Sequence, residues 1–354
     1  RVAVVDRTGA RVGQGFFNPR SQIAVRLLTD LGEPALDDTW LAERLAAAAR
    51  LRREVLRLEE VTDAYRVVHA EGDGLSGLVV DRLGSLLVVE LFSLGWSRWL
   101  PALGNALEAL FPGLNVHVRL DKRSAELEGM PPLHPRAGRA GVTGEIREHG
   151  LRFKVDAAEG HKTGFFCDQR DNRRSFRELV RGRTVLDAFC YSGGFALSAA
   201  AGGAASVTAV DLDEKALELA KTNAALNHAK VDFQHADVFN FLRAEAAAGR
   251  RYGAIVLDPS KFARGQAGVP AALGAYEDLN RLALGVLEPG GLLLTCSCSG
   301  AISLDEFRGA VHRASRMAGR PLEVLETRGA GPDHPVAMAC PETSYLKALF
   351  CRAR

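Results

Sequence analysis

Two cysteines lie close together at the end of an aliphatic run, in the stretch GGLLLTCSCSG from Gly290 to Gly300. A cysteine thiolate is a nucleophile that can form a temporary covalent bond with a substrate. Ligands of α/β proteins bind outside the carboxyl ends of parallel strands, and the aliphatic run is typical of such a strand. We therefore take Cys298, which lies further past the run, as the candidate nucleophile, and expect Cys296 to be buried against a helix. The alternative is an inert thiol at both positions, since cysteine is among the most frequently buried residues.

Aspartates mark the ends of three other predicted strands. Asp211 ends the strand in AVDLD, Asp237 ends the one in HADVF, and Asp258 ends the one in VLDPSKF. A carboxylate at the first position can accept hydrogen bonds from both ribose hydroxyls, and one at the second can meet an adenine amino group. Three consecutive acidic strand ends rarely arise from packing alone, so we expect a nucleoside-containing cofactor at this edge.

A glycine turn between a strand and a helix completes this predicted site, in TVLDAFCYSGGFALSAA. Glycine lets the backbone approach a ligand, and the helix N-terminus offers amides to a carboxylate. The turn lacks the G-x-G-x-x-G spacing of nicotinamide-binding proteins, and Tyr191 stands where a glycine is expected, so S-adenosylmethionine fits better than NAD. The residues predicted from these segments to bind the cofactor are Asp187, Phe189, Tyr191, Ser192, Gly193, Gly194, Asp211, Asp237, Val238, Asp258 and Pro259.

The combination of a thiol with a methyl donor favours methylation of cytosine at carbon 5. That carbon becomes reactive when a thiolate adds to carbon 6. Asp258 would hydrogen-bond the N3/N4 edge of the base, and Phe262 could stack on it. The base must leave its stack to reach both groups. The sequence does not identify the group that removes the carbon 5 proton.

The elements that would position these residues alternate between strand and helix after about residue 180. Such alternation predicts a parallel sheet covered by helices on both faces. The last two strand-like runs, PLEVLETRG and YLKALFCR, have no helix between them and predict an antiparallel hairpin at the sheet edge. This is the topology of class I methyltransferases, so we expect an α/β, Rossmann-like, seven-stranded sheet.

The first half of the chain predicts two smaller modules. Residues 1–28 contain three short strands, and residues 37–60 form a strongly amphipathic helix. Strands, a helix and further strands over residues 65–156 predict a small α+β domain. A polar loop between its strands is either a solvated connector or a segment that binds RNA phosphates. Its basic residues are Lys122, Arg123, Arg136 and Arg139.

Several motifs together resemble the bacterial large-subunit ribosomal RNA cytosine-5 methyltransferases. They are HKTGFFCDQRDNR, VLDAFCYSGGF, VLDPSKF, YEDLN, LLLTCSCSG and DHPV…PETSYLK, with AEGDGLSGLVVDR and GSLLVVELFS in the central part. The resemblance implies a PUA-like β-barrel module at residues 1–37, a linker helix and central strand-strand-helix-strand-strand domain at 38–160, and a methyltransferase domain at 161–354. It also implies a 23S rRNA cytosine, in the free RNA or a large-subunit precursor, as the substrate.

Residue roles follow from the same resemblance. It makes Cys298 the nucleophile and has the segment from Lys162 to Arg173 close over the cofactor, with Phe166, Gln169 and Arg173 as contacts. A linker between a strand and a helix is the alternative for that segment. Two departures from the family pattern are Ser260, in place of a second proline, and a PUA-like module without its first strands in the chain as given.

Bulk composition narrows the remaining possibilities. The 354 residues carry a net charge of +2, so a phosphate-binding surface must be local. Scattered cysteines without zinc spacing predict reduced thiols, no metal and a cytoplasmic protein. No apolar run is long enough for a membrane span. A homodimer is a candidate assembly. The alternatives are a related rRNA guanine methyltransferase that needs no thiol and a non-catalytic RNA-binding or ribosome-assembly protein; a dehydrogenase is disfavoured.

Overall fold

The structure of the protein, a computed structural model, describes residues 1–354 except 31–34, 133–141, 158–163 and 264. The chain divides into two compact units, and each is described by itself. Unit 1 comprises residues 1–150, 154–167 and 332–343. Unit 2 comprises residues 151–153, 168–331 and 344–354. The division into three domains that we expected from sequence stays a prediction, and the structure adds that residues 332–343 belong to unit 1.

Unit 1 begins with a three-stranded antiparallel sheet that matches the predicted strands. Its order is β1-β2-β3, with β1 at Val2–Val5, β2 at Arg11–Phe17 and β3 at Val25–Asp30. Leu28 and Phe16 of this sheet are buried in the same hydrophobic core as the rest of the unit. The structure shows a small sheet here rather than a closed barrel.

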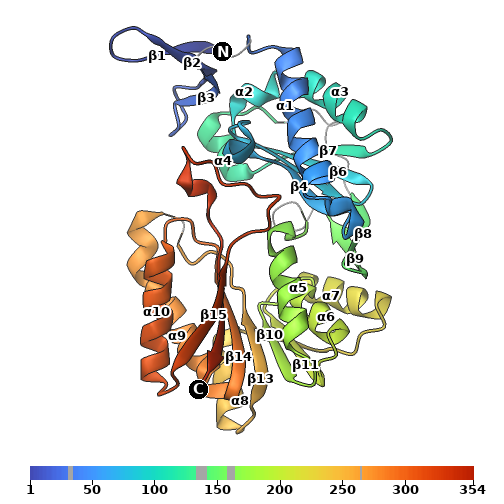
Figure 1. The fold of residues 1–354 in the computed structure, drawn as a ribbon, viewed down its shortest axis with the longest axis vertical. Helices are drawn as coiled ribbons and strands as arrows, with labels where there is room; N and C mark the ends of the chain where they lie inside the picture. The colour runs from blue at the N-terminus through green and yellow to red at the C-terminus, as the bar shows by residue number, and fades with distance from the viewer. Residues whose placement is uncertain (31–34, 133–141, 158–163, 264) are drawn as a thin grey trace. The chain divides into compact units, whose positions relative to one another are not determined.

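The central part of unit 1 is a four-stranded sheet of order β4-β5-β6-β7 packed against helices (Figure 1). Asp37 caps α1 by accepting a hydrogen bond from the Trp40 amide, and the apolar stripe of α1 enters the core. The elements are α1 (Asp38–Arg50), a π-helical turn (Leu51–Val55), β4 (Ala64–His69), β5 (Leu78–Leu83), β6 (Leu86–Leu91), α2 (Leu94–Ser97), α3 (Leu100–Leu110), β7 (Asn115–Leu120) and α4 (Lys122–Glu128). A hairpin of β8 (Thr143–Glu148) and β9 (Leu151–Asp156) follows.

Unit 2 is an α/β domain with one mixed sheet of order β12-β11-β10-β13-β14-β16-β15. The first five strands are parallel, whereas β16 is antiparallel to both β14 and β15. This confirms the expected seven-stranded sheet with an antiparallel hairpin at its edge. The strands are β10 (Thr184–Ala188), β11 (Ser206–Asp211), β12 (Asp232–His235), β13 (Tyr252–Leu257), β14 (Leu287–Ser297), β15 (Leu322–Arg328) and β16 (Lys347–Ala353).

Helices cover both faces of this sheet, as Figure 1 shows. One hydrophobic cluster joins the sheet to α8, α9 and α10, and a second joins it to α5, α6 and α7. The strand β13 is buried along its whole length because both of its faces are covered. The helices are α5 (Arg170–Leu179), α6 (Gly194–Ala201), α7 (Glu214–Leu226), α8 (Val238–Ala247), α9 (Val269–Val286) and α10 (Leu304–Met317).

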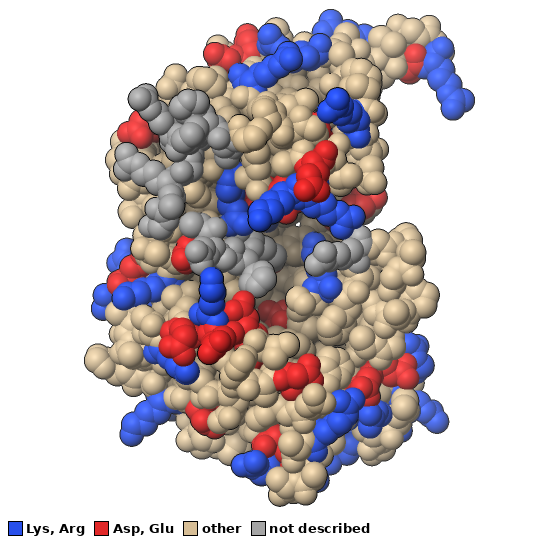
Figure 2. Space-filling view, turned by 180° about the vertical axis from the view of Figure 1, so that it is seen from behind, with Lys and Arg blue, Asp and Glu red and all other residues tan. Residues whose placement is uncertain are grey.

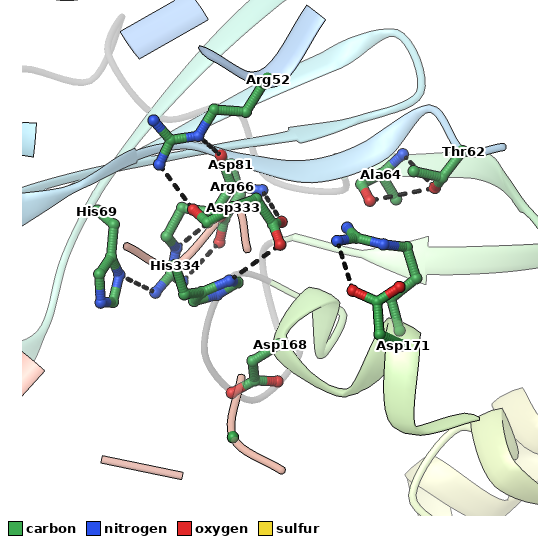
Figure 3. Close-up of polar contacts among 12 residues, drawn as sticks. Arg52, Thr62, Ala64, Arg66, His69, Asp81, Asp168, Asp171, Asp333 and His334 are labelled. Carbon is green, nitrogen blue, oxygen red and sulfur yellow. Dashed lines mark hydrogen bonds and ion pairs between the residues drawn. The ribbon is translucent and has the colours of Figure 1, made fainter. Parts of the chain in front are cut away.

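The segment 332–343 is fixed to unit 1 by buried charged groups (Figure 3). The Arg66 amide donates to the Asp333 carboxylate at 2.9 Å, and the Arg52 guanidinium donates to the Asp333 carbonyl oxygen at 2.6 Å. Arg52 also pairs with Asp73, and Arg66 pairs with Asp81 through two hydrogen bonds of 2.8 and 3.0 Å. Because these groups satisfy one another away from water, they hold the segment in one conformation.

Candidate active site

The glycine turn after β10 has an unusual backbone. Phe189 and Tyr191 have φ values of 66° and 48°, in the left-handed region that favours glycine, and Gly193 has a φ of 87°. Each non-glycine residue in this region costs roughly 1 kcal/mol, which the surrounding structure must offset. Tyr191 therefore takes the conformation of the glycine that it replaces. The tight turn brings the N-terminus of α6 to the carboxyl edge of the sheet.

Asp187 is buried beneath this turn and is short of partners. Its Oδ2 accepts a hydrogen bond from the Ala196 amide at 2.7 Å, whereas Oδ1 is buried with no hydrogen-bond partner among the described residues. Burial, together with the nearby Asp258 and Asp211 carboxylates, raises the pKa of Asp187 to about 8. Two of the three predicted strand-end acids, Asp211 and Asp258, thus lie close enough to Asp187 to disfavour its ionisation, an arrangement that favours a cationic ligand.

Asp211 and Asp237 shape the same edge of the sheet. Asp211 accepts hydrogen bonds from the amides of Tyr191 and Asp213 at 2.8 and 2.9 Å. Asp237 follows β12 by two residues and caps α8 by accepting from the Asn240 amide at 3.0 Å. Both carboxylates are partly exposed, and Val238 beside them is buried. Each carboxylate still has an oxygen lone pair for a ligand, because a carboxylate can accept about four hydrogen bonds.

The turn after β13 and the residues after β14 meet at this edge. The Cys298 thiol lies 3.7 Å from the carbonyl oxygen of Pro259. The next residue, Ser299, accepts a hydrogen bond from the Ala263 amide at 3.3 Å and lies 3.3 Å from the Tyr276 hydroxyl. Two loops that are far apart in sequence are therefore joined directly beside Asp258.

The two cysteines of β14 have different surroundings, as expected. Cys296 is fully buried in the cluster that contains α5 and α6, and burial raises the pKa of its thiol well above the ordinary value. Cys298 follows the last residue of the strand, Ser297, and is partly exposed. Of the two thiols, only Cys298 can be reached by a substrate in this conformation.

The segment before α5 contributes buried polar side chains to unit 2. Gln169 is buried, and its side-chain oxygen accepts a hydrogen bond from the Asn172 side-chain amide at 2.6 Å. The Arg173 side chain packs 3.1 Å from the point where a Cβ on Gly194 would lie, so a larger residue at that position would displace it. Phe166 belongs to unit 1 and is partly buried. Lys162 lies outside the described residues. Phe262 packs on Tyr276 with ring centroids 4.7 Å apart.

Three further polar residues lie in this part of unit 2, although no role was expected for them from the sequence. The Tyr345 hydroxyl donates to the Asp168 carboxylate. Lys347, the first residue of β16, donates to the carbonyl oxygens of Ser299 and Tyr345 at 2.6 and 2.9 Å. A lysine at the start of a strand is usually solvent-exposed, so its pattern carries no signal of a buried site.

Comparison with known proteins identifies the family of the chain. The family model of S-adenosylmethionine-dependent methyltransferases matches residues 65–352, and a PUA-like domain model matches residues 1–30. The chain belongs to the S-adenosylmethionine-dependent methyltransferase family. It is 39% identical over 358 residues to ribosomal RNA large subunit methyltransferase I of Shewanella denitrificans, covering 99% of this chain and 89% of the relative. It is 37% identical to the protein of the same name from Escherichia coli, covering 99% and 90%.

Solved structures agree on the fold of this methyltransferase. SMU.776, assigned as a methyltransferase and solved in complex with SAH, superposes with a TM-score of 0.85 at 21% identity, covering 99% of this chain and 90% of that one. Trm5b from Pyrococcus abyssi gives a TM-score of 0.56 at 18% identity, covering 77% and 74%.

The residues present suit S-adenosylmethionine, the cofactor of the family. Its sulfonium and ammonium groups are positive, and this site gathers Asp187, Asp211 and Asp258 with an Asp187 oxygen that lacks a partner among the described residues. Over the described residues, no group of three His, Cys, Asp or Glu side chains could hold a metal ion, and no helix is long and apolar enough to cross a membrane.

Proposed function

We propose that this methyltransferase modifies carbon 5 of a cytosine in 23S rRNA, with Cys298 as the nucleophile. The observation that carries the proposal is the position of the thiol, partly exposed and 3.7 Å from the Pro259 carbonyl oxygen at the acidic edge of the sheet. The names of the relatives, ribosomal RNA large subunit methyltransferases, support rRNA as the substrate class.

The proposed reaction begins with addition of the Cys298 thiolate to carbon 6 of the cytosine. The new S–C bond raises electron density at carbon 5, the carbon that is methylated. When bound, S-adenosylmethionine supplies a methyl group on a positively charged sulfur. Asp258 would bind the N3/N4 edge and hold the ring over the thiol. A base then takes the carbon 5 proton, the C–H electron pair restores the ring double bond, and the electron pair of the S–C bond returns to sulfur.

Cofactor contacts are part of the same proposal. Around the turn, Tyr191, Ser192 and Gly194 would contact the amino-acid part of S-adenosylmethionine, while Asp211 and Asp237 would bind its ribose and adenine. Gln169, just before α5, and Arg173, in α5, would enclose it. Two features support this assignment: Asp211 and Asp237 are partly exposed, and Arg173 is buried.

RNA binding in this proposal depends on local clusters of lysine and arginine side chains, because the net charge of the chain is only +2. Figure 2 shows lysine and arginine side chains interspersed with acidic ones over the face that it displays. The match of residues 1–30 to a PUA-like domain supports an N-terminal module that contacts RNA. A large-subunit precursor or free 23S rRNA would be the partner, with the target base flipped out of its stack.

The experiment compares Cys298→Ala with the matched control Cys296→Ala. Purified protein, 23S rRNA and methyl-labelled cofactor are incubated, and the RNA is digested to nucleosides for mass spectrometry. We expect 5-methylcytidine with the wild type and the control and none with Cys298→Ala. Transfer of the methyl group to a guanine nitrogen, unaffected by loss of the Cys298 thiol, would contradict the proposal. Binding of labelled cofactor to Cys298→Ala shows that the variant is folded.

A further inference from the structure

Lys347 is a buried amine on the strand that pairs with the end of β14. It lies opposite Ser297 in the β14–β16 register and is only 6% exposed. Its Nζ donates to the Ser299 carbonyl oxygen, one residue past Cys298, and to the Tyr345 carbonyl oxygen. The side chain therefore ends beside the backbone that carries the proposed nucleophile.

This amine has no carboxylate partner among the described residues. The ion pairs of the described part of the chain do not include Lys347, and both of its hydrogen bonds go to neutral carbonyl groups. Burying an ammonium group without an anion costs several kcal/mol, so proteins rarely do so without a compensating charge. A thiolate at Cys298 and the Glu306 carboxylate are the negative charges that favour the ammonium, and the thiolate has the larger effect.

The hydrogen-bonding capacity of the amine fits this arrangement. A neutral amine has two N–H donors and one lone pair, whereas an ammonium has three donors. Two donors are occupied by the Ser299 and Tyr345 carbonyl oxygens. The remaining position of Nζ can hold either a lone pair or an N–H, and so can take a proton from a thiol that approaches it or donate to the resulting thiolate.

We propose that Lys347 activates Cys298 by accepting the thiol proton and then stabilising the thiolate as an ammonium. The S–H bond breaks, its electron pair stays on sulfur, and an N–H bond forms on Nζ. The pair keeps a net charge of zero, and no further reactant is needed. The inference rests on the proposed function, because it names the group that prepares the nucleophile of that reaction.

Electrostatics around the pair support the transfer. Burial lowers the pKa of Lys347 to about 8, while a Cys298 thiolate raises it. An ordinary thiol has a pKa of about 8.5, so the two groups are closely matched. Other charged or titratable groups act on the pair from neighbouring elements. Lys261 lowers the pKa of Lys347, and Glu306 of α10 raises it. A Cys298 thiolate in turn raises the pKa of Cys296 of β14 and of Tyr276 of α9.

The test measures the pH dependence of Cys298 alkylation without RNA or cofactor. Iodoacetamide reacts with the thiolate, so the rate at each pH reports the thiolate fraction, and mass spectrometry of peptides separates Cys298 from the other thiols. Cys340, the other partly exposed cysteine, is the internal reference. In the wild type we expect the midpoint at Cys298 to lie below the ordinary thiol value and below that of Cys340.

Three variants separate charge from packing. Lys347→Met should raise the midpoint at Cys298 by about one pH unit or more, which is a tenfold loss of thiolate at neutral pH. Lys347→Arg retains a cation and should keep the midpoint low, although its pKa prevents it from accepting the proton. Lys261→Met removes an exposed cation near the pair and should raise the midpoint at Cys298 less than Lys347→Met does. None of the three should change the profile at Cys340.

Each outcome decides the inference. A wild-type midpoint at or above that of Cys340, or equal upward shifts in Lys347→Met and Lys347→Arg, would overturn it. The wild-type measurement remains decisive if Lys347→Met does not fold. A low midpoint that depends on Lys347, in a protein whose Cys298→Ala variant still methylates RNA, would support the proton transfer while contradicting the proposed methylation mechanism.

Discussion

The substitution Asp187→Asn tests the electrostatics of the cofactor site. Burial raises the pKa of Asp187 to about 8 in the folded protein, and an unfolded aspartate has a pKa near 3.9. Between these values the folded state holds a proton that the unfolded state has lost. Its contribution to stability is therefore complete below about pH 4 and is lost as the pH rises toward 8. Asparagine keeps an oxygen for the Ala196 amide and does not titrate.

The expected size of the effect follows from this one proton. The free energy of unfolding of unit 2 should fall by about 1.4 kcal/mol per pH unit in the wild type relative to Asp187→Asn, or roughly 3 kcal/mol from pH 5 to pH 7. A change in hydrogen bonding at the Oδ1 position, which has no partner among the described residues, would add an offset that does not vary with pH. The slope against pH is therefore more informative than the difference at one pH.

Hydrogen exchange of the β10 and α6 peptides measures this slope. The three tryptophans of the chain, Trp40, Trp96 and Trp99, all lie in unit 1, so fluorescence does not report on unit 2. Comparing the two proteins at the same pH cancels the intrinsic exchange rate. Protection of Asp187→Asn relative to the wild type should increase about tenfold per pH unit between pH 5 and 7 and level off above 8. A ratio that stays constant across this range would refute the buried, protonated carboxyl.

Other predictions concern single contacts in each unit. Burial lowers the pKa of His69 to about 3, so unit 1 should lose stability as the pH falls from about 6.5 toward 3, and His69→Gln should flatten that loss, as measured by tryptophan fluorescence in urea. Gly72→Ala would place a Cβ 2.1 Å from the Pro335 carbonyl oxygen and should cost about 1–3 kcal/mol in the same assay; an unchanged midpoint would contradict the packing. Ser303→Ala removes a capping box with Glu306 and should cost about 1 kcal/mol, seen as faster exchange in α10, with no change if the cap is unimportant.

The order of elements in unit 2 could be predicted because each has a local signal. Buried strands with turn residues after them and helices with capping side chains repeat from residue 184 onward, and the final pair of strands without a helix indicated the hairpin. The same signals placed Asp258 and Cys298 at one edge, since carboxyl ends of parallel strands share that edge. The strand-end position of Cys298 also separated it from the buried Cys296.

Features that depend on distant parts of the chain could not be predicted this way. Lys347 has an ordinary strand environment in sequence, and its burial follows only from the position of β16 beside β14. Membership of residues 332–343 in unit 1 follows from the pairing of Asp333 with the backbone of Arg66, 267 positions away. The left-handed conformation of Phe189 has no signal in its residue type, because bulky side chains rarely adopt it.

The place of β16 in the sheet affects the order in which the protein can fold during synthesis. β16 follows every other strand in the sequence, yet it lies between β14 and β15. While residues 347–353 are still inside the ribosome, β14 and β15 each present an open backbone edge to the cell, and such edges can pair with other chains. Nascent chains stalled before this strand should therefore require chaperones, whereas completion of the last strand closes both edges at once.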